Sequence, residues 1–148
     1  MDNKEVKVLI FSINGEFYAT DIMEVERILG YEEPTALPDS PDFIEGVINY
    51  EGSILPVISL ARKFKLSQGD KKNESKIIVT KQAGDKIGII VDVVSEVRDV
   101  SEKNIETPPE IVASISQRYI KGLIKIDGKI IIFLNLGEIL TEEEKKLI

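Results

Sequence analysis

The chain contains no cysteine and no histidine among its 148 residues. These absences exclude disulfides, thiolate or imidazole metal sites, and nucleophilic catalysis by either residue. They also remove the side chain that most often acts as a general base near neutral pH. Tryptophan is absent too, and aromatic residues make up only 6% of the chain, so no platform for stacking nucleic-acid bases is evident. The composition therefore disfavours catalysis.

Positive charge is in deficit, with 19 lysines and arginines against 26 acidic residues and a net charge of -7. This charge opposes binding to phosphate backbones, so we expect no nucleic-acid partner. No apolar run approaches the roughly 20 residues that span a bilayer, and the start MDNKEVKV lacks the apolar segment of a secretory signal. We therefore expect a globular cytoplasmic protein of one domain, without direct membrane insertion.

The chain also lacks the common motifs for nucleotide and ester chemistry, including glycine-rich phosphate loops and Gly-x-Ser-x-Gly elbows. Two of its acidic residues near predicted strand ends could form an acid and base pair. The five candidates for such a pair are Asp21, Glu24, Asp92, Glu96 and Asp99. The simpler interpretation is that they are solvated charges, which discourage edge-to-edge strand pairing. We predict no catalytic, cofactor-binding or metal-binding residues, which leaves a binding module.

The strongest positive signal is a hairpin pattern in residues 46–64, GVINYEGSILPVISLARKF. It predicts two strands joined at Glu51 and Gly52, where Gly52 can adopt the positive φ that the turn needs. Pro56 in the second strand predicts an edge position or a bulge, because proline donates no ladder hydrogen bond. Ser59 is placed to cap a short helix.

The same pattern returns in residues 122–140, GLIKIDGKIIIFLNLGEIL. One constant shift, which places Gly46 on Gly122 and Gly52 on Gly128, aligns the two stretches without a gap. This indicates duplication into two related half-domains, although any two hairpins with glycine turns share some of the pattern. A weaker similarity relates residues 82–100 to residues 13–28 and needs a gap.

The turn signals along the rest of the chain separate about ten short strands, which predicts an all-β protein of small barrels. The pair Asn14-Gly15 is the strongest short hairpin signal, and residues 23–29 are ambiguous between strand and helix. Residues 67–75 are predicted as a surface loop, 106–116 as containing a short helix, and 141–148 as a terminal helix.

Four segments in this order resemble the CheW chemotaxis coupling family, over nearly the whole chain. They are FSINGEFYATDIMEVERIL, LPDSPDFIEGVINYEGSILPVISL, GIIVDVVSEV and KGLIKIDGKIIIFLNL. The resemblance implies two intertwined five-stranded SH3-like β-barrels, no enzymatic activity, no cofactor and an adaptor role. We expect one CheW-like domain over residues 1–148. Its first barrel would span roughly 14–66, and its second roughly 76–140 plus the strand 6–13, with a helix at 141–148.

Members of this family join the histidine kinase CheA to the cytoplasmic tips of chemoreceptors, the methyl-accepting chemotaxis proteins. The resemblance implies two binding faces: the barrel ends, for the kinase's regulatory domain, and an apolar groove between the barrels, for a receptor's helical hairpin. Core packing is the alternative role for the apolar members of this set. The candidate protein-binding residues are Val25, Arg27, Ile28, Ile44, Gly46, Glu51, Gly52 and Val97.

Two charged positions depart from the family pattern. The family usually has Asn-Leu-Arg-Gly at residues 49–52, where this chain carries Glu51, and often has glutamate where this chain carries Arg27. We therefore predict a swapped ion pair between Arg27 and Glu51. Ser59 and Asn135 replace aspartates of the family and remain good N-caps.

Loss of the family arginine keeps a second function open, a structural scaffold paralogue that binds the kinase or the array ring but not receptors. A third, a small barrel that binds an oligonucleotide or a peptide, is disfavoured by the net charge of -7 and the few aromatic residues.

Overall fold

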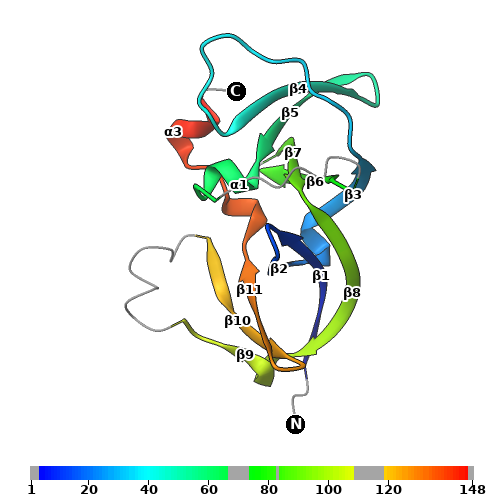
Figure 1. Ribbon diagram of the computed structural model, residues 1–148, viewed down its shortest axis with the longest axis vertical. Coiled ribbons are helices and arrows are strands. Elements are labelled where there is room, and N and C mark those ends of the chain that lie inside the picture. The colour runs from blue at the N-terminus through cyan, green and yellow to red at the C-terminus, as the bar shows by residue number, and fades with distance from the viewer. Residues whose placement is uncertain (1–3, 67–73, 83, 109–118, 147–148) are drawn as a thin grey trace.

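Two small barrels lie one above the other in the computed structural model, which describes residues 4–66, 74–82, 84–108 and 119–146 (Figure 1). The strands are β1 (Glu5–Ile13), β2 (Glu16–Asp21), β3 (Val25–Gly30), β4 (Ile44–Tyr50), β5 (Ser53–Ser59), β6 (Lys76–Gln82), β7 (Asp85–Val91), β8 (Val93–Ser101), β9 (Ile105–Glu106), β10 (Ile120–Ile126) and β11 (Lys129–Leu134). The short helices are η1 (Ile22–Glu24), α1 (Leu60–Lys63), η2 (Glu102–Asn104), η3 (Leu136–Glu138) and α3 (Glu142–Lys145). The all-β prediction is confirmed.

Some predicted elements fall wholly or partly outside the described ranges. These are most of the loop 67–75, most of the segment 106–116 with its helix, and the end of the helix 141–148. The ambiguous segment 23–29 divides into the end of η1 and most of β3.

Three hairpins turn through a pair of residues that both have positive φ. The pairs are Asn14-Gly15, Glu51-Gly52 and Asp127-Gly128, with φ between 50° and 82°. This is the type I′ geometry, whose twist matches that of the flanking strands. The predicted positive φ at Gly52 is confirmed, and the same turn chemistry fixes the register of both repeated hairpins.

The strands form a six-stranded sheet in the order β8-β1-β2-β11-β10-β9 and a five-stranded sheet in the order β3-β6-β7-β5-β4. The predicted division of the chain was therefore wrong for β2, which joins the barrel built mainly from residues 93–134, and for β6 and β7, which join the barrel containing β3 to β5. The strands of a tight hairpin stay in one sheet, so β2 follows β1 and the hairpin β6-β7 moves as a unit.

Matching registers show that the two sheets are copies. The hairpin β1-β2 closes with the pair Ile13↔Glu16, and β6-β7 closes in the same way with Gln82↔Asp85. The hairpins β4-β5 and β10-β11 also have the same pairing, under the shift that aligns their sequences. Both similarities in the sequence are thus structural. Each half of the sequence gives its first hairpin to the barrel that the other half completes, so the barrels are intertwined.

Pro56 lies inside a sheet rather than at an edge. β5 has β7 on one side and β4 on the other, so the edge prediction was wrong. Pro56 faces Val47, whose N–H and C=O both bond to Thr35 at 2.9 Å. The ladder between β5 and β7 begins only at Val57. The missing N–H of proline therefore leaves no ladder bond unmade.

Of the two predicted helix caps, one at Ser59 and one at Asn135, only the first is confirmed. The Ser59 side chain accepts a hydrogen bond from the N–H of Arg62 and so caps α1. Thr141 and Glu144 form a complete capping box at α3. Asn135 makes no side-chain cap at η3, which corrects that prediction. Leu136 of η3 is fully buried, so packing holds this turn in place.

One hydrophobic core is shared by both barrels. It combines Phe11 of the six-stranded sheet with Ile58 and Ile78 of the five-stranded sheet, and Leu136 of η3 is packed among them. A smaller cluster belongs to each sheet alone. Because the largest cluster crosses between the sheets, apolar burial fixes the orientation of the barrels.

Candidate protein-binding site

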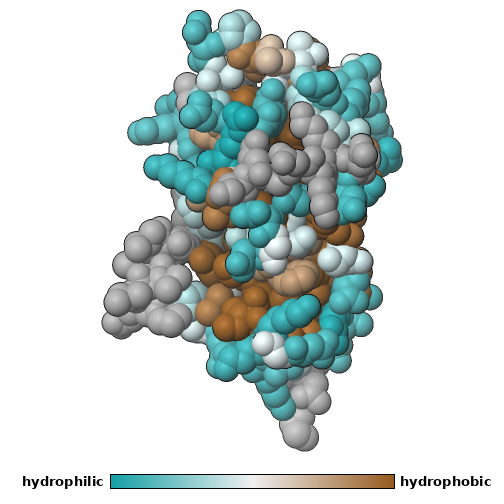
Figure 2. Space-filling model, viewed as in Figure 1, coloured by the Kyte–Doolittle hydropathy of each residue, from teal (hydrophilic) through white to brown (hydrophobic). Residues whose placement is uncertain are grey.

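Large apolar side chains reach the surface at a few places in the described part of the chain. They are Met23 (86% exposed), Ile54 (76%), Ile130 (60%), Val97 (49%), Ile28 (39%) and Leu37 (38%). In addition, Figure 2 shows apolar residues gathered over β10 and β11 on one face of the six-stranded barrel. Exposed apolar residues that gather at defined positions are typical of binding surfaces.

The first position comprises the two edge strands β3 and β8. Ile28 on β3 and Val97 on β8 occupy equivalent places in the two sheets, because the shift that aligns Ile13 with Gln82 also aligns these two residues. Met23, in η1 just before β3, is the most exposed large apolar residue described. The sequence-based prediction missed Met23. A methionine within the charged stretch MEVER could have indicated an exposed apolar residue. Val25 is half-buried against the shared core.

Ile44 does not belong to this surface. Its side chain is only 6% exposed and packs in the shared core. On β4 every second residue is buried, and Ile44 has the same parity as Ile48 and Tyr50. The prediction that Ile44 lines a groove is therefore corrected.

The second position is the outer end of each barrel. Ile54 and Ile130 each lie two residues after the glycine of a hairpin turn, and they occupy the same place in the two repeated hairpins. Glu51 and Gly52 are exposed in the first of these turns. Gly46 is different because it is buried, with φ of +142°. A β-carbon there would lie 2.1 Å from the carbonyl oxygen of Thr35, so Gly46 shapes β4 and is not part of the exposed surface.

The predicted ion pair between Arg27 and Glu51 is not formed among the described residues. The Arg27 guanidinium instead lies 5.8 Å from the centroid of the Tyr50 ring. Glu26 accepts a hydrogen bond from the Tyr50 hydroxyl at 2.8 Å and pairs with Lys86 at 3.0 Å. A bulge at Glu26 shifts the register of β3, so that Val25 pairs with Thr80 and Arg27 with Val79, while Glu26 is left out of the ladder.

These contacts join β3 and β4, the two edges of the five-stranded sheet. In the other barrel, Arg98 of β8 lies 3.4 Å from Asp127 in the turn between β10 and β11. The six-stranded barrel therefore links an edge strand to a hairpin turn by an ion pair. The five-stranded barrel links its two edge strands by the hydrogen bond between Tyr50 and Glu26.

We expect the Glu26→Gln variant to lower the pKa of the Tyr50 phenol and still leave it above its ordinary value. Burial first, and hydrogen bonds to Glu26 and Glu51 next, together raise this pKa to about 12. The measurement is a pH titration of the tyrosine Cζ resonances by ¹³C NMR. Tyr18, whose pKa is raised by burial first and by Glu16 second, is the internal control and should not change. A Tyr50 pKa that is the same in both proteins would contradict the role of Glu26.

The acidic residues near strand ends have structural partners. Glu24 accepts hydrogen bonds from Lys121 Nζ at 3.0 Å and from the N–H of Gly137 at 2.9 Å. Asp92 accepts one from the N–H of Asn14, and Asp21 caps η1. Glu96 and Asp99 each form an ion pair with a basic side chain. These contacts favour a structural interpretation over an acid and base pair.

Within the described ranges, no group of three or more potential ligand side chains is placed to hold a metal ion. The helices of the same ranges are too short and too polar to span a bilayer.

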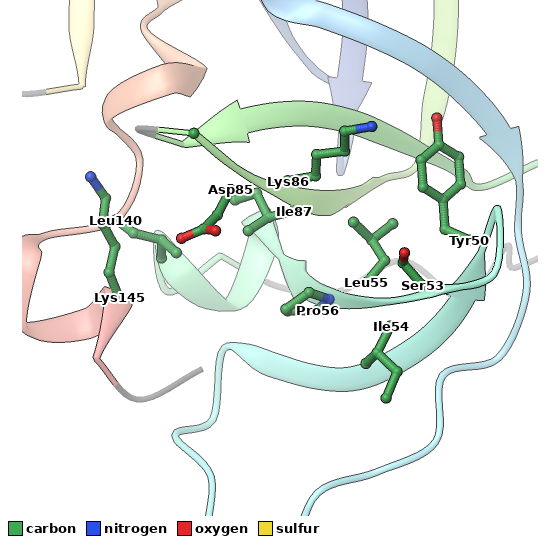
Figure 3. A pocket seen from close by; sticks show the side chains of 11 residues that line it. Tyr50, Ser53, Ile54, Leu55, Pro56, Asp85, Lys86, Ile87, Leu140 and Lys145 are labelled. Atoms are coloured by element: carbon green, nitrogen blue, oxygen red, sulfur yellow. The ribbon is translucent and has the colours of Figure 1, made fainter.

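A hollow of about 370 Å³ opens at the end of the five-stranded barrel, beside Ile54 (Figure 3). Leu55 and Pro56 of β5 line one side, and Asp85 and Lys86 of β7 line another. Leu140 and Lys145, near the C-terminus, complete it.

The shared core and the exposed apolar residues at edges and turns define a two-barrel binding protein. Residues 7–144 match the protein-family model for the CheW-like domain. The chain therefore belongs to the CheW family, and its resemblance to that family is confirmed.

Similar proteins agree with this assignment. Chemotaxis protein CheW of Klebsiella aerogenes is 34% identical over 141 residues, covering 95% of this chain and 84% of that protein. Chemotaxis protein CheW of Thermotoga maritima is 34% identical over 142 residues, covering 94% and 90%. The crystal structure of the scaffolding protein TtCheW from Thermoanaerobacter tengcongensis aligns with a TM-score of 0.88 and 36% identity, covering 98% of this chain and 99% of that chain. The predicted SH3-like barrels are confirmed by this likeness.

Proposed function

We propose that this protein is a non-enzymatic adaptor in the cytoplasm that couples the tips of chemoreceptors to the histidine kinase CheA. Membership of the CheW family supports the adaptor role. The observation that carries the proposal is the presence of two separate sets of exposed apolar residues. One lies on the edge strands, at Ile28 and Val97, and the other at the barrel ends, at Ile54 and Ile130.

The two sets suit different partners. The barrel ends would receive the kinase's regulatory domain, end to end, and the edge strands would receive the helical hairpin of a receptor tip. Met23 and Val25 extend the receptor surface, while Arg27 lies beside it on β3. Coupling further requires that the adaptor bind two states of the kinase with unequal affinity, because equal binding would transmit no signal.

A scaffold paralogue that binds the kinase or the array ring but not receptors is the second candidate. The exposed Glu51, in the turn where the family usually carries arginine, favours it. If that arginine contacts a receptor directly in other members, a carboxylate at this position would weaken the contact.

We expect Val97→Asp to weaken binding of a receptor-tip fragment at least tenfold and to leave kinase binding unchanged, because a buried unpaired charge is costly at an interface. Ile130→Asp, at the end of the six-stranded barrel, should instead weaken binding of the kinase's regulatory domain and leave receptor-tip binding unchanged. The measurement is NMR titration of ¹⁵N-labelled protein with CheA regulatory domain and then with the receptor tip, with Val97→Thr as a control of similar shape. Kinase binding without receptor binding in the wild type would favour the scaffold alternative. Binding to neither partner would refute the coupling role.

A further inference from the structure

The hollow at the end of the five-stranded barrel has a counterpart in the other barrel. The matching hairpin registers make Lys86, at the start of β7, equivalent to Phe17, and Ser53, at the start of β5, equivalent to Lys129. In the six-stranded barrel, the ammonium group of Lys129 lies 4.7 Å from the centroid of the Phe17 ring. Phe17 also packs against the core of that sheet. In the six-stranded barrel, the place equivalent to the hollow therefore holds an aromatic ring beneath a lysine.

In the five-stranded barrel, the position equivalent to Phe17 carries Lys86, and the ring that lines the hollow is that of Tyr50. Ser53 is too short to fill the hollow, and the Lys86 side chain extends toward Tyr50, away from Pro56 and Leu140 (Figure 3). Lys86 is held in that direction by its ion pair with Glu26 at 3.0 Å and by the Tyr50 ring, 5.7 Å from its ammonium group. With Lys86 in place of Phe17 and Ser53 in place of Lys129, a hollow of about 370 Å³ remains.

The lining matches the chemistry of an aromatic side chain. Leu55, Pro56 and Ile87 supply apolar surface, and the hollow borders the exposed Ile54. Lys145, which also lines the hollow, carries an ammonium group, and ammonium groups are attracted to the negative face of an aromatic ring.

We propose that this hollow receives an aromatic side chain from the partner that docks on this barrel end. The partner would supply between molecules the ring that Phe17 supplies within the chain. This inference rests on the proposed function, in which that partner is the kinase's regulatory domain. The six-stranded barrel end, already filled by Phe17, would bind through Ile130 without a hollow of this kind, so the two ends differ in what they accept.

The first test uses small probes and does not involve the kinase. N-acetyl-phenylalanine amide is titrated into ¹⁵N-labelled wild-type protein, with N-acetyl-leucine amide as the aliphatic comparison. We expect saturable shifts at the amides of Ser53, Leu55 and Ile87, with the leucine probe binding about threefold more weakly or worse. The Lys86→Phe variant, which places a ring in the hollow, should abolish these shifts. Equal binding of the two probes, or no shift at these amides, would overturn the proposal.

The second test uses the regulatory domain of CheA. We expect Lys86→Phe to weaken its binding about tenfold, because the partner's ring is excluded. Lys86→Gln removes the charge without filling the space, and should cause a smaller loss. An equal loss in both variants would assign the effect to charge and overturn the proposal, as would wild-type affinity in Lys86→Phe.

The two tests separate the inference from the proposed function. If the regulatory domain does not bind the wild type, the coupling role fails, and the probe titration still decides whether the hollow accepts an aromatic ring. If Lys86→Phe is unfolded, as judged by its NMR spectrum, the wild-type comparison of the two probes still supports or overturns the proposal.

Discussion

Replacing Gly46 with alanine should lower the free energy of unfolding by about 3 kcal/mol or more. Gly46 has φ of +142°, a conformation that side chains with a β-carbon rarely adopt. The added carbon would also lie 2.1 Å from the Thr35 carbonyl oxygen and 2.6 Å from its carbonyl carbon. The backbone of Thr35 is hydrogen-bonded to Val47 of β4. Relieving the clash with the added β-carbon therefore requires β4 and Thr35 to separate. Urea denaturation of the variant and the wild type measures the loss.

Two other glycines provide controls. Gly30→Ala places its β-carbon in open space, so we expect a change of about 0.5 kcal/mol or less. Gly122 is equivalent to Gly46, but its β-carbon would first meet a side-chain methyl of Ile105 at 2.6 Å, which can move more easily than backbone. Its loss should therefore lie between the other two. A Gly46→Ala protein as stable as Gly30→Ala would contradict the described approach of Thr35.

Replacing Lys63 with methionine should cost about 3 kcal/mol at neutral pH. The Lys63 side chain, only 7% exposed, pairs with Glu144 of α3. Its ammonium group also lies 4.8 Å from the centroid of the Phe43 ring and 5.6 Å from that of Tyr119. The substitution leaves Glu144, 21% exposed, without this cation, and a carboxylate that loses its partner in a partly buried site is costly. Lys65→Met, at an exposed neighbour, is the control.

The cost of Lys63→Met should shrink in acid. Burial raises the pKa of Glu144, but the hydrogen bond from Lys63 and those of the Thr141 capping box outweigh it, and the net pKa lies below the ordinary value. The resulting stability is present above the unfolded pKa of about 4.3 and is lost as the pH falls through the lower folded value. Urea denaturation at pH 7 and at about pH 3 tests this. A cost that does not change with pH would contradict the ion pair.

The local structure was readable from the sequence because its signals are local. Turn pairs such as Asn14-Gly15 and Glu51-Gly52 set hairpin geometry within a few residues, and Ser59 caps the helix that directly follows it. The duplication was visible for the same reason, since both copies use the same turn chemistry.

The assignment of hairpins to barrels was not readable, because it depends on parallel pairs such as Phe133↔Ala19 between strands near opposite ends of the chain. No local pattern specifies which of two similar sheets a hairpin joins. The prediction for Arg27 failed for a related reason. One bulge residue, Glu26, changes the direction in which the side chains of β3 point, and a bulge leaves little trace in the sequence.

Part of the candidate site could have been corrected from the sequence. The strand Ile44–Tyr50 alternates, so Ile44 shares its buried parity with Ile48 and Tyr50. Ile54 pairs across the hairpin with the exposed Asn49, which places it on the outward face at the start of β5. The hollow beside Ile54 could not have been found in this way, because it results from the direction of one lysine side chain.

The exchange of hairpins has a consequence for how the chain reaches its fold. Cutting it between α1 and β6 would yield two fragments, each with strands for both barrels and enough for neither. Neither fragment could close a barrel alone, so folding would become an association between molecules. The covalent connection supplies a high effective concentration of one half around the other. The duplicated chain thus resembles two swapped subunits made permanent by a peptide link, with a fold that does not depend on how dilute the protein is.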